Sequence, residues 1–152
     1  MLGRMSDRAR AAWAGAAAAT VWALLEPLDR RVFRSDYSDV AMLGKLVTPG
    51  RAWRAAGFAV HAANGALFGL GYHELRRRLD VDPRRLALTL ALVENVALYP
   101  LGILVDRRHP ARGEPGLAPL FSLRAFAQET ARHAVFGLVL GRLATTAEPS
   151  RP

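Results

Sequence analysis

The chain has 152 residues, of which 51% are hydrophobic, and it carries a formal net charge of +8 without a single cysteine. This length suits one domain, and the apolar fraction excludes a disordered basic tail, which lacks the side chains to bury a core. The missing cysteines exclude disulfide scaffolds and thiolate metal sites, so a basic soluble helical domain and a small membrane protein with arginine-rich edges remain.

Four apolar stretches follow one another along the chain. The first, residues 11–25, has no charged residue, and the second, residues 55–72, has His61 as its only ionisable group. Residues 86–105 form the third stretch, which is interrupted only by Glu94, and residues 125–144 form the fourth and most polar one. Lengths of roughly 15 to 20 residues exceed ordinary strands and indicate helices.

Local signals mark where these helices begin and end. Asp82 before Pro83 is typical of an N-cap with proline at the first helical position, and Ser122 is the expected N-cap of the fourth helix. Pro27 is expected to end or bend the first helix near Glu26, and Pro100 to kink the third.

The connections differ in length and character. Residues 26–51 are long enough to hold a short interfacial helix, capped by Ser35 or Asp36. The short second connection predicts that the second and third helices are antiparallel neighbours. Residues 106–122 are rich in Pro and Gly and predict irregular structure. We therefore expect a single domain over residues 1–145 and a disordered tail over 146–152.

Several features favour a membrane over water. The second and third stretches have the roughly 20 apolar residues of a spanning helix. Arginines cluster at the borders of the stretches, where they suit lipid headgroups. Glycine pairs spaced four apart, which permit close helix packing in lipid, are Gly65 with Gly69 and Gly137 with Gly141. The predicted fold is an all-α, integral-membrane four-helix bundle with up-down topology.

This fold predicts a multi-pass protein of the cell membrane, with the lipid bilayer as its partner and a homo-oligomer or larger membrane complex formed through the glycine faces. Basic residues tie ten to ten between the two sides, so the positive-inside rule does not choose an orientation. The dense arginines of the second connection favour cytoplasmic termini. Nucleic acid is not an expected partner, because only Lys45 among the basic residues is lysine and the arginines lie at helix ends.

Ionisable groups within spans are costly and usually face the bundle interior. Counting along the helices places His61 and His133 at a similar depth, roughly 13 Å from one end. The spacing predicts that all four helices contribute to one polar cluster in that half of the bundle. Its expected members are His61, Asn64, Glu94, Asn95, Glu129, Arg132 and His133.

Three interpretations of this cluster remain open. It can hold the helices together through paired charges, or it can serve ion, proton or small-substrate passage. It can also hold a metal ion or a haem through His61 and His133, with Glu26, Glu94 and Glu129 as further candidate ligands. No nucleotide-binding, HExxH or nucleophile-elbow motif is present. We expect a non-enzymatic transport-like, scaffold or accessory subunit without a cofactor, with a membrane redox protein and a soluble basic bundle as the alternatives.

Other residues receive simpler interpretations. Trp13, Trp22 and Trp53 are expected to face lipid or its interface as anchors. The loop acids Asp36 and Asp39 are expected to be caps or solvated groups. His73 and His109 are expected at the surface.

Overall fold

The computed structural model describes residues 5–48 and 50–145, and within these ranges it is helical, apart from one isolated β-bridge between Tyr37 and Leu117. The predicted tail, residues 146–152, lies outside the described residues. The elements in chain order are α1 (Asp7–Val32), α2 (Asp39–Val47), α3 (Trp53–Arg76), α4 (Pro83–Leu98), a 3₁₀ turn (Tyr99–Leu101), α5 (Gly102–Arg108) and α6 (Leu123–Thr145).

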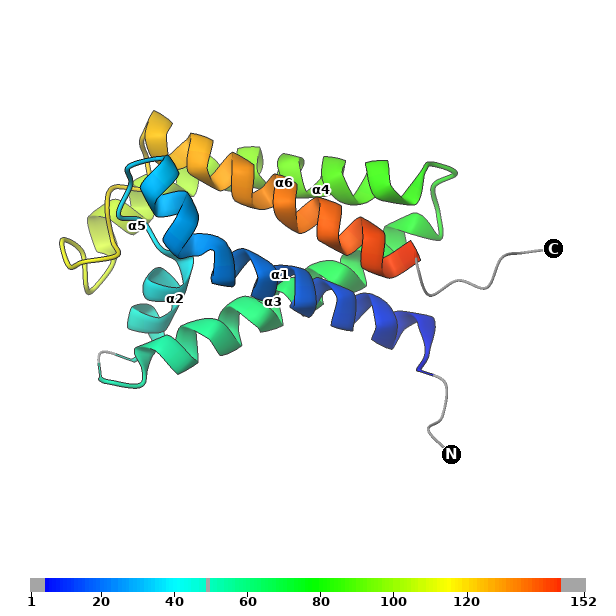
Figure 1. Cartoon of the computed structure of the whole chain (residues 1–152), viewed down its shortest axis with the longest axis horizontal. Coiled ribbons are helices and arrows are strands. Elements are labelled where there is room, and N and C mark those ends of the chain that lie inside the picture. The colour runs from blue at the N-terminus through cyan, green and yellow to red at the C-terminus, as the bar shows by residue number, and fades with distance from the viewer. Residues whose placement is uncertain (1–4, 49, 146–152) are drawn as a thin grey trace.

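The four long helices run alternately in opposite directions (Figure 1). The start of α1, the turn between α3 and α4, and the end of α6 lie at one end of the molecule. The short helices α2 and α5 lie at the other end, which we call the α2 end. The all-α prediction is confirmed, and the short helix expected in the first long connection is present as α2.

The helices pack as two tight pairs, α1 with α3 and α4 with α6, which are joined along α1 and α6. In contrast, α3 and α4 scarcely touch, although the short turn after Arg76 connects them directly. The prediction that they are packed neighbours is therefore wrong. The short turn makes them antiparallel, but it does not press their faces together. This leaves the α3–α4 side as the open side of the bundle.

Close backbone approach explains the tight pairs. A Cβ atom built on Gly65 would overlap the backbone of Gly15 in α1, and one built on Gly69 would overlap the Ala11 carbonyl. In the other pair, a Cβ atom on Gly137 would lie 2.7 Å from the Cα of Leu88. Gly141 likewise lies against α4. Small residues let helix backbones meet in this way. Because both glycine pairs are buried within the chain, they are not available to join copies of it, which corrects the expected oligomer interface.

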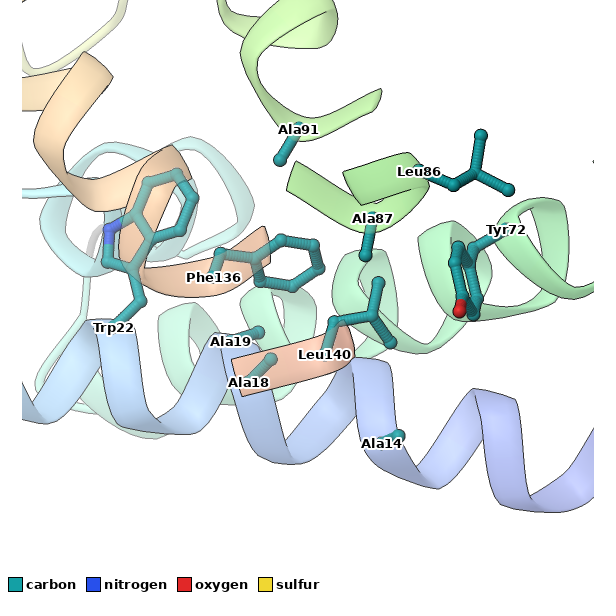
Figure 2. Close-up of a cluster of buried hydrophobic side chains, with 10 residues drawn as sticks. All are labelled: Ala14, Ala18, Ala19, Trp22, Tyr72, Leu86, Ala87, Ala91, Phe136 and Leu140. Carbon is teal, nitrogen blue, oxygen red and sulfur yellow. The ribbon is translucent and has the colours of Figure 1, made fainter. Parts of the chain in front are cut away.

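The apolar core has mostly small side chains on α1 and large ones on α6 (Figure 2). Leu140 and Phe136 of α6 lie among alanines of α1 and α4, and Trp22 closes the core toward the α2 end. The small alanine side chains of α1 and α4 leave space between these helices, and the large side chains of α6 fill it. The polar side chains of α6 are therefore carried into the interior.

The predicted helix ends are partly right. Asp82 caps α4 and Ser122 caps α6, each accepting a hydrogen bond from the backbone N–H three residues later. At Pro100 the third helix changes to a 3₁₀ turn, as expected of proline. Pro27 does not end α1, which continues to Val32 while Glu26 and Asp29 on either side of Pro27 bind other elements. The last turns of α1 do bend away from its axis, which is the other outcome expected of proline (Figure 1). The N-cap of α2 is Ser38, and not Ser35 or Asp36.

Two helical segments are long and apolar enough to cross a membrane: α1, and the continuous stretch from Pro83 to Arg108. In the second segment only 17% of the most apolar window is buried inside the protein. Its large side chains therefore face outward, among them Val93, Val96, Leu101 and Leu104. A soluble protein normally buries such a surface.

Candidate functional site

A buried arginine organises the polar half of the bundle. The side chain of Arg132 on α6 is only 2% exposed, and all five of its N–H groups have acceptors. Two bind both carboxylate oxygens of Asp29 at 2.6 and 2.7 Å, two bind Asp39 and Glu129 at 2.8 Å each, and one binds the Tyr37 carbonyl oxygen at 3.1 Å. A planar guanidinium suits such a set of fixed acceptors.

Glu26 connects this arginine to the start of α2. Its carboxylate accepts hydrogen bonds from the backbone N–H groups of Asp39 and Val40, at 2.8 and 3.2 Å, and from the Ser38 hydroxyl. It also lies 4.0 Å from the Arg132 guanidinium. A negative charge at a helix N-terminus satisfies free N–H groups and interacts favourably with the helix dipole. Glu26 therefore fixes α2 across the end of the bundle.

Asp39 is the meeting point of three elements. Its carboxylate accepts hydrogen bonds from the Trp22 indole at 3.1 Å, from the Tyr37 hydroxyl at 2.9 Å and from Arg132. Burial, together with the Asp39 carboxylate, raises the pKa of Tyr37 well above its usual range, so the hydroxyl remains a donor. Asp39 is a buried acceptor rather than the solvated group that the sequence suggested.

Trp22 also departs from its prediction. It is buried rather than facing lipid, and its indole packs edge-on against the rings of His61 and His133, with centroid distances of 5.0 and 4.6 Å. In contrast, Trp13 is exposed, as an anchor would be. The two histidines therefore lie at the same depth in the bundle, and both contact the Trp22 indole.

The two imidazoles present bare nitrogen atoms. His133 Nδ1 lies 2.8 Å from the Glu129 carbonyl oxygen, which can only accept, so we assign the proton to Nδ1. His61 Nε2 is buried and has no hydrogen-bond partner among the described residues. In its neutral form, His133 therefore offers Nε2 as an acceptor, and His61 adds a second ring nitrogen without a partner.

The remaining predicted members lie at the open side. The Glu94 side chain is 40% exposed, and its Oε2 lies 3.7 Å from His133 Nε2, beyond hydrogen-bond distance. Asn95 is buried and donates to the Thr130 hydroxyl at 2.8 Å, while Asn64 is exposed on α3. Glu94 thus has no arginine or lysine partner among the described residues.

These groups line one cavity of about 290 Å³ between the two helix pairs. Its polar wall includes His61, His133 and Glu94, and its apolar wall is formed by large side chains, among them Phe68, Phe136, Leu98 and Tyr99. Its lining includes the exposed Asn64 of α3 and the partly exposed Glu94 of α4, and these two helices scarcely touch. Its volume is close to the lower end of small-molecule sites, about 300–1,000 Å³.

The structure divides the predicted cluster into two parts. Glu129 and Arg132 belong to the ion-pair network with Asp29, Asp39 and Glu26, whereas His61, His133, Glu94 and the two asparagines lie outside this network and line the cavity. Glu129 and Asp39 also line the cavity. Among the described residues, no group of three His, Asp or Glu side chains is arranged to hold a metal ion. His109, expected at the surface, is buried and its Nε2 contacts the Met42 carbonyl oxygen at 2.9 Å.

Two residues of the site were missed from the sequence, namely Asp29 and Tyr37, while Asp39 and Trp22 were expected to be solvated and lipid-facing and are instead buried. A signal for α1 was available, since Trp22, Glu26 and Asp29 are spaced four and three apart and therefore share a face. No such signal exists for Tyr37 and Asp39. They reach Arg132 only because α2 folds back across the bundle end.

Comparison of the chain with protein-family models, with curated proteins and with solved structures finds no match.

Proposed function

We propose that the chain is a multi-pass protein of the cell membrane whose four long helices all span the bilayer, and that it binds a small molecule in the lateral cavity. Its role is transport-like or accessory rather than enzymatic. The observation that carries this proposal is a partly polar cavity lined by residues of α3 and α4, two helices that scarcely touch and whose outer surfaces are apolar. We infer from this that the cavity opens sideways between them. A ligand dissolved in the bilayer would reach this opening directly.

The distribution of charge supports the membrane part of the proposal. Between Arg124 and Arg142, the charged side chains of α6 are all buried, and Leu138 is the large hydrophobic side chain that is exposed. The segment 125–141 therefore has an uncharged outer surface. Its 17 residues extend roughly 25 Å along the helix, and the hydrocarbon core of a bilayer is about 30 Å thick. The fourth helix, which is too polar to insert alone, thus hides its charges against the other helices.

Membrane topology can be tested with single cysteines, because the natural chain has none. A polar, membrane-impermeant maleimide should leave Val96→Cys and Leu138→Cys unlabelled in intact cells and in inverted vesicles. Asp80→Cys and Arg112→Cys should be labelled from opposite sides, with Asp80 reached from the cytoplasm. Labelling of Leu138→Cys together with recovery of the protein in the soluble fraction would instead support the soluble basic bundle.

Ligand binding can be tested in the purified protein in lipid nanodiscs. A neutral probe, 2-phenylethanol, should bind saturably by calorimetry, since the cavity has both aromatic walls and polar groups. Leu98→Trp, which fills the cavity from its lining, should abolish this binding. The matched control is Val96→Trp, because Val96 is exposed on the same helix and does not line the cavity. Equal binding by both variants would contradict the proposed site.

A further inference from the structure

We infer that the cavity selects a small lipophilic amine in its protonated form, with its ammonium group at Glu94 and His133 and its apolar body against Phe68 and Phe136. This inference names the ligand class of the proposed function and rests on it. The evidence is the balance of donors, acceptors and charge in the cavity wall.

The cavity presents acceptors that lack donors. His133 Nε2 and Glu94 Oε2 face each other at 3.7 Å, and neither carries a hydrogen when the ring is neutral and the carboxylate ionised. His61, which is nine-tenths buried, adds the unpartnered Nε2, which is a third acceptor in the tautomer that carries its hydrogen on Nδ1. An unmet acceptor in a buried site is unfavourable, so a ligand that supplies N–H groups stabilises all three.

Most donors deep in the cavity are already used. The Trp22 indole and the Tyr37 hydroxyl both donate to Asp39, and the Asn95 amide donates one of its two N–H groups to Thr130. None of the described residues that line the cavity is arginine or lysine. An anionic ligand would therefore find no cation in the wall, whereas an ammonium group would find several acceptors.

The charged groups of the cavity wall also favour a cationic ligand. Three carboxylates line the cavity, of which Asp39 and Glu129 are paired with Arg132. Of the three, only Glu94 lacks a permanent cation, and its side chain is the most exposed, which places it nearest the proposed opening. In surroundings of low dielectric constant, a carboxylate attracts an opposite charge far more strongly than in water. An amine that enters from the bilayer would meet this carboxylate first.

Three probes of similar size separate the possibilities: 2-phenylethylamine, 2-phenylethanol and phenylacetate, which are cationic, neutral and anionic at neutral pH. In nanodiscs of neutral lipid, calorimetry should rank the amine first and phenylacetate last. Glu94→Gln keeps the shape of the side chain and should weaken amine binding about tenfold, the equivalent of one lost charge-assisted hydrogen bond, while leaving 2-phenylethanol binding unchanged. Glu74→Gln, which removes an exposed carboxylate of α3 outside the cavity, is the matched control.

The outcomes distinguish the two proposals. If 2-phenylethanol binds and Leu98→Trp removes it, but the amine binds no better and is insensitive to Glu94→Gln, the amine inference is wrong and the binding site stands. If phenylacetate binds best, the charge argument is refuted. If none of the probes binds the wild-type protein, both proposals fail. His61→Phe supplies a second test, since it removes the buried acceptor without shrinking the ring and should also weaken amine binding.

Discussion

Replacement of Arg132 by methionine should destabilise the protein more than replacement of any other charged side chain of α6. Methionine keeps the length and much of the volume of the side chain but has no donor and no charge. Asp29, Asp39 and Glu129 would then lose their direct hydrogen bonds to the guanidinium group, and Glu26 its nearby positive charge. Removal of one partner from a buried ion pair typically costs about 3–5 kcal/mol.

The structure also predicts the effect of a conservative change. Lysine in place of Arg132 keeps the charge but has three N–H donors, whereas all five donors of the arginine are used. At least two charge-assisted hydrogen bonds are lost, at about 1.5 kcal/mol each, so Arg132→Lys should cost about 3 kcal/mol. Lysine is therefore a poor substitute here, although it is normally considered conservative.

The measurement is the free energy of unfolding in mixed detergent micelles, followed by circular dichroism as a denaturing detergent is titrated in. Arg142→Met is the matched control, because Arg142 is exposed on the same helix, and its effect should lie within about 0.5 kcal/mol of zero. An Arg132→Met variant as stable as the wild-type protein would show that the buried ion pairs of Arg132 do not stabilise the fold. A lysine variant indistinguishable from wild type would show that the five-donor geometry is irrelevant.

Two further predictions concern the packing around the site. Gly69→Ala should lower the free energy of unfolding by about 1–3 kcal/mol, because the new methyl group overlaps the backbone of α1. Gly71→Ala on the same helix points into open space and should raise stability by about 0.5–1 kcal/mol; the same sign for both would contradict the close approach of α1 and α3. Glu26→Gln should speed hydrogen exchange of the first two amides of α2 about tenfold, because a charged acceptor becomes a neutral one. Glu74→Gln is its control, and unchanged exchange in Glu26→Gln would show that α2 is held by other contacts.

Much of the fold follows from local sequence features. The length and composition of the four apolar stretches are enough to predict helices, and the caps at Asp82 and Ser122 lie where the sequence places them. Pro27 shows the limit of such local signals. Proline predicts that a helix ends or bends, and the local sequence does not choose between the two. Here Glu26 and Asp29 bind other elements, and α1 continues to Val32.

The site was less predictable because its pairs are distant in sequence. Helix periodicity shows which residues of α6 share a face, and it therefore indicates Glu129, Arg132 and His133 together. It does not show which acid a buried arginine will bind. Asp39 lies 93 residues before Arg132 and meets it only after α2 has folded across the bundle. The cavity was unpredictable for a similar reason, since chain connectivity brings α3 and α4 together but does not decide how closely they pack.

The position of Arg132 on α6, the last of the four long helices in chain order, also sets an order of assembly. Asp29 is made 103 residues before the arginine that neutralises it, which corresponds to about 5–20 s at ordinary rates of protein synthesis. During this interval the acids of α1 and α2 have no buried cation to bind, so they have no reason to leave water or the headgroup layer. Arg132 of α6, the last helix to be made, therefore supplies the positive charge with which Asp29 of α1 can be buried. The native bundle can close only after α6 has been made.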